Sequence, residues 1–318
     1  MLKVSAALSL LFILISSNLA PAQTSEQSAL AQASALVKAG KRKQAASVLA
    51  AASKAHPASE ALHAALGRVL FKQAKYEEAV QELGQALQIN PDSRENSMLL
   101  AESLIGWQHY GVAVDFLHAV QNKFGGFPEF HYDLGLAYYS LNQTKDAKPE
   151  LEEALRLAPT LDRAQYLLAA CLATEGDYAK SIEIFRKLVK EHPQNASYWA
   201  TYAQMLMRVG NENLPEALKA CRRARTLKPR DLHVQYVTAT ILLQGGNFAE
   251  ARPLFEHLAS VSPKELSTHV ALVRIYSQLG ERELAKKQIE IVHQIEKEGT
   301  PNTAPVPPPP AGQDQPSN

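Results

Sequence analysis

Cysteine is scarce in this sequence, with two residues in 318. Two thiols exclude a small fold held together by several disulfides, and they exclude zinc or iron–sulfur sites built from several cysteines. A charge excess is missing too, because 33 basic and 32 acidic side chains leave a formal charge of +1. Nucleic-acid-binding proteins normally need a basic surface that displaces counterions from phosphate. The sequence therefore predicts neither a disulfide scaffold nor a nucleic-acid-binding protein.

Sequence signatures of catalysis are also missing. The motifs H-E-x-x-H, G-x-S-x-G and G-x-x-x-x-G-K do not occur, and neither does a glycine-rich phosphate loop. The ten histidines are scattered, and no two lie three or four positions apart on one helix face, so a zinc site has no support. We therefore expect a protein that is not an enzyme and that needs no metal or cofactor.

Long hydrophobic runs are confined to the N-terminus. Lys3 precedes a stretch of 12 uncharged residues, 4–15, and the small residues Ala20 and Ala22 follow it. This pattern is typical of a secretory signal peptide cleaved after Ala22, and the run is too short to span roughly 30 Å of hydrocarbon. No cysteine lies near the cleavage site to carry a lipid anchor. We expect residues 1–22 to be a signal peptide and the mature protein to be periplasmic or secreted, without a membrane-spanning segment; an uncleaved signal anchor is the alternative.

Alanine is abundant, with 48 residues, and this favours close-packed helices over strands. Prolines recur with gaps of 34, 68, 34, 36 and 34 residues, at Pro57, Pro91, Pro159, Pro193, Pro229 and Pro263. A period of 34 residues is typical of helical repeat arrays. With proline at repeat position 32, eight repeats start near residues 26, 60, 94, 128, 162, 196, 232 and 266, and the sixth carries a two-residue insertion. The array is predicted to occupy residues 23–299.

Other repeat positions follow the same period. Position 8 is small in every copy but the last, as at Gly67 and Gly135, and position 20 is Ala or Ser throughout, as at Ala79 and Ala147. Positions 11 and 24 are large and apolar in most copies. Small residues let two antiparallel helices approach closely, and large ones fill the space between them. Position 15, where a helix needs a left-handed cap, holds Gly40, Gly176, Gly210, Gly246 and Gly280.

The pattern W-x2-L-G-x2-Y, A-x3-F and P resembles that of the tetratricopeptide repeat, most fully in residues 63–91 and 131–159. The chain is identified as a member of that family, although the third repeat has Gly125 where proline is expected. The resemblance implies an all-α fold, a right-handed α-α superhelical solenoid of about eight helix-turn-helix repeats. It also implies a protein-binding function, since bacterial relatives of this layout serve in envelope assembly, secretion or pilus machinery.

Positions 2, 5, 9, 12 and 13 of each first helix are predicted to face the concave groove of the solenoid. The residues chosen there as the partner-binding site are Arg68, Phe71, Met98, Tyr132, Tyr139, Arg163, Tyr166, Met207, Arg208, Tyr236 and Arg274. Tyrosine and arginine are enriched in interfaces because each combines a large contact area with directional hydrogen bonds. Tyr132, Tyr139 and Tyr166 are expected to form the apolar anchor. The alternative is that some of these tyrosines complete the packing between repeats.

Three further features have a structural and a functional interpretation. His63, His131 and His269 share repeat position 4 with Trp199, which favours packing over metal ligation. Cys171 and Cys221 lie on predicted helices, and a disulfide between them stays possible in an oxidising compartment. Residues 300–318 are rich in proline and are predicted to form a disordered tail or spacer.

The leading functional hypothesis is an extracytoplasmic scaffold for protein–protein interaction. It would bind a peptide or helix of a partner protein in the concave groove and act in envelope assembly or secretion. The alternative is a non-selective holdase or structural repeat protein without one dedicated partner. A selective groove should contain hot-spot residues, whereas a holdase groove should be broadly apolar.

Overall fold

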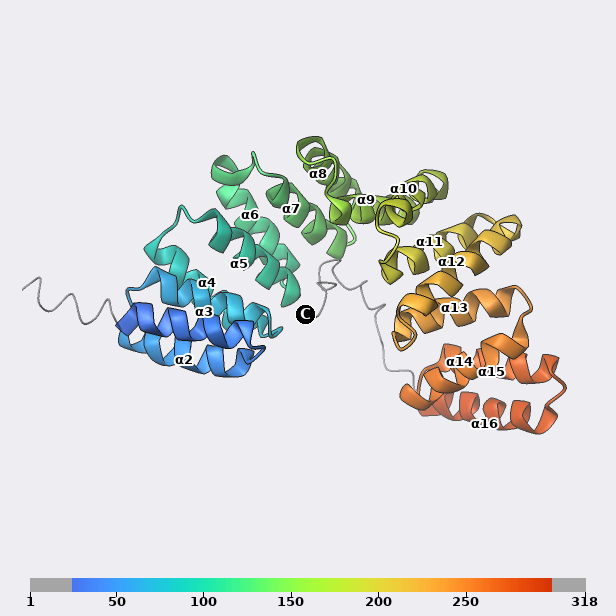
Figure 1. The fold of residues 1–318 in the computed structure, drawn as a ribbon. Coiled ribbons are helices and arrows are strands. Elements are labelled where there is room, and N and C mark those ends of the chain that lie inside the picture. Colours follow the sequence, from blue (N-terminus) through green and yellow to red (C-terminus); the bar gives the residue numbers. More distant parts are fainter. Residues whose placement is uncertain (1–24, 299–318) are drawn as a thin grey trace, which may run out of the picture. The chain divides into compact units, whose positions relative to one another are not determined.

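The computed structural model describes residues 25–298 (Figure 1). The predicted signal peptide, 1–22, and the proline-rich tail, 300–318, lie outside the described residues. Every regular element within 25–298 is a helix, and none of these helices is both long and apolar enough to cross a membrane. The chain divides into two compact units between Leu157 and Ala158. Each unit has its own buried core.

The first unit begins with a helical segment at 25–38, after which helices follow one another with short turns. They are α2 (Arg42–Ala55), α3 (Glu60–Phe71), α4 (Tyr76–Ile89), α5 (Arg94–Gly106), α6 (Tyr110–Phe124), α7 (Pro128–Ser140) and α8 (Thr144–Leu157). Each first helix of a repeat packs closely on its second helix, as α3 does on α4 and α7 on α8. The leucines at position 24 fill the space between the paired helices and are almost completely buried: Leu49, Leu83, Leu117 and Leu151.

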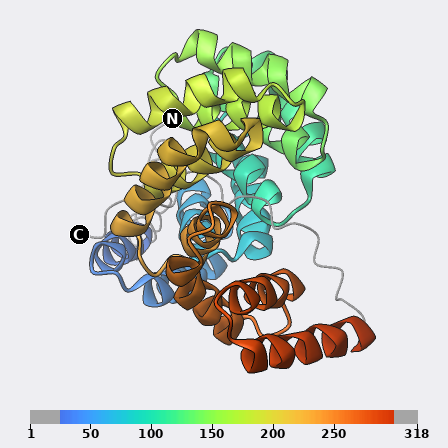
Figure 2. The same cartoon turned by 90° about the vertical axis from the view of Figure 1, so that its right-hand side faces the viewer.

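The second unit continues the same arrangement. Its helices are α9 (Asp162–Thr174), α10 (Tyr178–Glu191), α11 (Ala196–Val209), the short 3₁₀ helix η1 (Asn211–Asn213), α12 (Leu214–Leu227), α13 (Leu232–Gln244), α14 (Phe248–Val261), α15 (Leu266–Gln278) and α16 (Arg282–Glu298). Figures 1 and 2 both show the last pair, α15 and α16, lying side by side. The chain is therefore an all-α solenoid of helix-turn-helix repeats.

The sequence determines where these helices begin and end. First helices begin at Glu60, Arg94, Pro128, Asp162, Ala196, Leu232 and Leu266, the starting points that the 34-residue period gives. Side-chain caps stabilise several of these helix N-termini. Ser59 Oγ accepts a hydrogen bond from Leu62 N at 3.2 Å, and Asp231 Oδ1 accepts one from Val234 N at 3.0 Å. Second helices end two residues before a proline wherever position 32 holds one, since the residue before proline avoids the helical conformation.

The close approach predicted at positions 8 and 20 is confirmed. A Cβ atom on Gly67 would lie 2.7 Å from Leu83 Cγ, and one on Gly135 would lie 2.8 Å from Leu151 Cγ. Ala147, at position 20, is completely buried. The paired helices α3–α4 and α7–α8 therefore leave no room for a larger side chain at Gly67, Gly135 and Ala147.

The left-handed turn predicted at position 15 occurs in most repeats. Gly40, Gly176, Gly246 and Gly280 have φ between 73° and 88°. The prediction is wrong for Gly210, whose φ of 161° is extended, because the two-residue insertion of the sixth repeat forms η1 there. Ala74, Gln108 and Asn142 adopt positive φ in the other turns despite their side chains.

Side chains at repeat position 4 link most first helices to the turn before them; α5 is the exception, because its Ser97 donates to the Ser93 carbonyl instead. His131 Nε2 lies 2.7 Å from the carbonyl oxygen of Gly125 and donates to it, because a carbonyl can only accept. The same contact to the residue six positions earlier is made by His63, Gln165, Trp199, Gln235 and His269, at 2.7–3.2 Å. Position 4 is therefore a structural hydrogen-bond donor.

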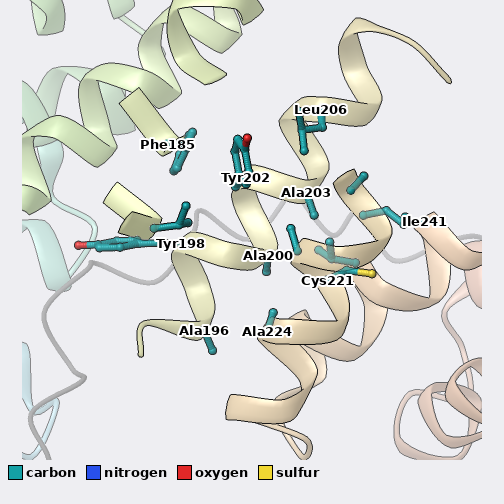
Figure 3. Packing of buried hydrophobic residues seen from close by; sticks show 14 of the residues in the cluster. Phe185, Ala196, Tyr198, Ala200, Tyr202, Ala203, Leu206, Cys221, Ala224 and Ile241 are labelled. Atoms are coloured by element: carbon teal, nitrogen blue, oxygen red, sulfur yellow. The ribbon is translucent and has the colours of Figure 1, made fainter. Parts of the chain in front are cut away.

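The two thiols lie in the interior of the second unit. Cys171 on α9 and Cys221 on α12 are both buried, and neither forms a disulfide, so the bridge that the sequence left possible is absent from the described residues. Burial raises the pKa of the Cys221 thiol. Figure 3 shows Cys221 within the packed cluster around Tyr198 and Leu206. Both cysteines act as small apolar packing residues.

Candidate functional site

The first helices of the repeats form the inner layer of each unit. α5 packs on α7 in the first unit, and α11 packs on α13 in the second. Among the helices described, no comparably close pairing joins the second helices of successive repeats. In a curved stack of helix pairs, the helices on the inside lie closer together than those on the outside. Since the first helices are the ones that contact each other, they form the inside layer within each unit. We call its solvent-facing side the inner face; positions 2, 5, 9, 12 and 13 of each first helix are the ones predicted to lie there.

The first unit buries part of the predicted groove. Met98 and Tyr132 are only 9% and 4% exposed and pack into the interior. Phe71 and Tyr139 are half-buried, and Arg68 is exposed. Burial of Met98 and Tyr132 fits the packing alternative, because a partner could reach little of either side chain.

Tyr166 of the second unit is also mainly a packing residue. Its ring stacks on Tyr198 at 5.7 Å between centroids and meets Phe185 edge-on at 5.4 Å. Its hydroxyl lies 3.4 Å from Thr201 Oγ1, and burial raises the pKa of the phenol. Figure 3 shows Tyr198 and Phe185 in this cluster. These contacts join the fifth and sixth repeats, and they leave Tyr166 little surface for a partner.

The remaining predicted residues of the second unit reach solvent. Arg208 on α11, Tyr236 on α13 and Arg274 on α15 are exposed, Tyr236 to 40%. Met207 and Arg163 are half-buried. The structure thus places Arg208, Tyr236 and Arg274 on three successive first helices of one unit.

Sequence reasoning missed one apolar residue of this face. Val270, at position 5 of α15, is 51% exposed, whereas position 5 is buried at Ala64, Met98, Tyr132 and Ala200. Valine is not one of the residue types enriched in interfaces, so a prediction based on tyrosine and arginine could not identify it. Together with Tyr236, Val270 gives the seventh and eighth repeats an exposed apolar surface.

Charge is distributed unusually over these helices. α11, α13 and α15 contain no Asp or Glu, and their only Lys or Arg residues are Arg208 and Arg274. Neither arginine forms an ion pair within the described residues. The acidic residues nearest to these helices along the chain stand at helix ends or in turns: Glu212 in η1, Asp231 at the N-cap of α13, Glu265 at the N-cap of α15, and Glu281 in the turn after α15, where it pairs with Arg252.

The outer layer of the same unit, made of the second helices, is charged with both signs. Arg252 on α14 contacts Glu256 at 2.7 Å and Glu281 at 2.6 Å, and Arg222 on α12 contacts Glu250 at 3.0 Å. The Tyr276 hydroxyl donates to Glu256 at 2.8 Å. Burial, followed by the hydrogen bond to this carboxylate, raises the pKa of Tyr276 to about 12.

Neither a hollow in the first unit nor a cluster of metal-binding side chains competes with the inner face among the described residues. An open hollow of about 520 Å³ lies between α2, α3 and α4; Ala46 and Ala50 line it, and the Lys75–Glu78 ion pair stands at its edge. None of the residues predicted from the sequence lines this hollow. Within residues 25–298, no three His, Cys, Asp or Glu side chains lie together as metal ligands would.

These features define a class of protein: an array of paired helices that stack repeat upon repeat and present an extended surface. Tetratricopeptide repeat models match residues 36–103, 132–196 and 202–263, more than half of the chain. The chain belongs to the tetratricopeptide repeat family, and such arrays generally act as scaffolds that bind other proteins.

Similar structures share the fold. A tetratricopeptide repeat protein from Parabacteroides merdae has a TM-score of 0.63 and 19% identity, covering 84% of this chain and 99% of its own. PilF of Pseudomonas aeruginosa has a TM-score of 0.55 and 20% identity, covering 69% and 99%. Superkiller protein 3 of Schizosaccharomyces pombe is 29% identical over 103 residues, 32% of this chain and 7% of that protein. The chain spans only this small part of the relative's length, so the likeness concerns the repeats.

Proposed function

We propose that the inner face of the second unit binds an extended peptide or a helix of a partner protein. The observation that carries this proposal is the exposure of Tyr236, Arg208 and Arg274 on three successive first helices. Tyrosine and arginine are the residue types that dominate interface energetics, and the exposed Tyr236 and Val270 share position 5 of successive repeats, where each offers an apolar contact. No other part of the described inner face combines these features so fully.

The composition of this face supports a selective scaffold over a non-selective holdase. A holdase needs a broad apolar surface, but here amide side chains such as Gln204 and Gln244 alternate with Tyr236 and Met207. Amides must find hydrogen-bond partners when they are covered, and this requirement discriminates between clients.

Site-specific photocrosslinking tests the binding face. A photoreactive residue at Gln244, on the inner face, is compared with one at Lys219 on α12, in the full chain within its native cells. We expect Gln244 to crosslink a discrete protein and Lys219 to crosslink none. Crosslinks from Lys219 alone would contradict the proposal, and a broad smear of clients from Gln244 would favour the holdase.

We further propose that the scaffold acts outside the cytoplasm, in envelope assembly or secretion. The uncharged run at 4–15 and the small residues Ala20 and Ala22 support this address. Mass spectrometry of the protein purified from its host should find Gln23 as the first residue. An intact N-terminus on cytoplasmic protein would contradict the proposal.

A further inference from the structure

The inner face of repeats six to eight combines three properties that together specify a ligand chemistry. It has exposed apolar surface at Tyr236 and Val270. It has hydrogen-bonding side chains at Gln244 and Thr240, the latter half-buried with its hydroxyl donating to the Tyr236 carbonyl at 2.9 Å. Its formal charge comes from two arginines alone, on the helices to either side of α13.

The absence of carboxylates from these helices distinguishes the two arginines from the rest of the unit. Arg222 and Arg252 have acidic partners within 3.0 Å, so much of their charge is already compensated. Arg208 and Arg274 have no such partner, and no acidic residue of α11, α13 or α15 could supply one. A partner that covers these guanidinium groups must therefore bring the compensating charge itself, because burying an unpaired charge is costly.

We propose that the occupant of this face is an acidic peptide segment, in which carboxylate side chains reach Arg208 and Arg274 and an apolar residue packs on Tyr236 and Val270. This inference rests on the proposed function and names the chemistry of its ligand. Arginine suits the role because its planar guanidinium binds a carboxylate through two parallel hydrogen bonds. A basic peptide would meet the same arginines as a repulsive charge.

Matched synthetic peptides test the proposal. Three fluorescent libraries share the same apolar residues and differ only in the variable positions, which hold Asp and Glu, their amides Asn and Gln, or Lys. Binding to the full chain is measured by fluorescence anisotropy at low and high salt. We expect the acidic library to bind about tenfold more tightly than the amide library, with the difference shrinking as salt screens the charges. The Lys library should bind most weakly.

Single substitutions locate the effect. Arg208→Gln and Arg274→Gln should each remove a large part of the acidic preference and leave amide binding nearly unchanged. Lys219→Gln removes the same charge from the outer layer, where Lys219 is exposed and has no ion pair among the described residues, and it should change neither affinity. All three side chains are exposed, so each variant should fold, and circular dichroism checks this.

The outcomes separate the two proposals. Equal binding of the acidic and amide libraries, with both weakened by Tyr236→Ala, would overturn the acidic preference and leave the peptide-binding function standing. If Lys219→Gln weakened binding of the acidic library as much as the arginine variants do, the proposal would also be overturned, since the attraction would then depend on the net charge of the protein and not on this face. Absence of binding by every library would also overturn it, and the photocrosslinking experiment would decide the function independently.

Discussion

Repeat position 4 shows how different side chains can perform one structural task. Histidine, glutamine and tryptophan all occur there, and all donate to the carbonyl six residues earlier. What these side chains share is an N–H group at a suitable reach. The sequence predicted a packing role for the histidines, but not this hydrogen bond, because the acceptor is a backbone carbonyl that no residue type reveals.

His131 provides the sharpest test of this role. His131→Gln should retain the donor, as Gln165 does in the next repeat, and should cost less than about 1 kcal/mol. His131→Leu leaves the Gly125 carbonyl and the Glu150 carboxylate without their partner and should cost about 1–3 kcal/mol. Urea denaturation measures both, and equal losses would show that only the volume of the side chain matters.

Tyr276 predicts a pH dependence of stability. The folded pKa of about 12 lies above the ordinary value of 10, so the folded state keeps a proton that the unfolded state releases between these values. The contribution of Tyr276 is therefore complete below pH 10 and is lost as the pH rises towards 12. Urea midpoints at pH 9 and 11 should differ less in Tyr276→Phe than in the unsubstituted protein. If the difference between the two urea midpoints were the same in Tyr276→Phe as in the unsubstituted protein, the raised pKa of Tyr276 would be contradicted.

At the scale of helices, the period and the residue types at positions 8, 20 and 32 predicted the fold well. Local physics explains this success: proline stops a helix, a small residue permits close approach, and both effects depend only on nearby residues. Exposure on the inner face was less predictable. Tyr132 and Tyr236 share position 5, yet they are 4% and 40% exposed, because side chains of neighbouring helices decide how much of each ring is covered.

Helix α8 carries a proline in its interior, at Pro149. A proline at this place removes a backbone donor and crowds the preceding turn. Since Pro149 is exposed and contributes nothing to the core, Pro149→Ala should raise the free energy of unfolding by about 1–3 kcal/mol. Thermal and urea denaturation check this, and a loss of stability would mean that the proline ring makes a favourable contact.

The packing of α7 on α8 predicts a penalty for added volume. Ala147→Leu places three more carbons where Gly135 and Leu151 already approach closely, and should cost about 1–3 kcal/mol. Glu78→Ala is the control, because its ion pair with Lys75 is exposed and should be worth less than about 0.5 kcal/mol. A neutral Ala147→Leu together with a damaging Glu78→Ala would show that the assignment of repeat positions is wrong.

At the scale of the whole molecule, a repeat array differs from a globular domain because each repeat contacts only its neighbours. Buried alanines at position 20 in distant repeats, Ala79 and Ala251, allow this to be tested with equal chemistry. Ala79→Leu should speed hydrogen exchange within 26–127 and leave 232–298 protected, and Ala251→Leu should do the reverse. If either substitution loosened both regions equally, the array would unfold as one cooperative body.

Local loosening would instead mean that a partner bound to repeats six to eight stabilises mainly those repeats. In the same hydrogen-exchange experiment, the protection gained on adding the ligand should therefore fall within 196–298.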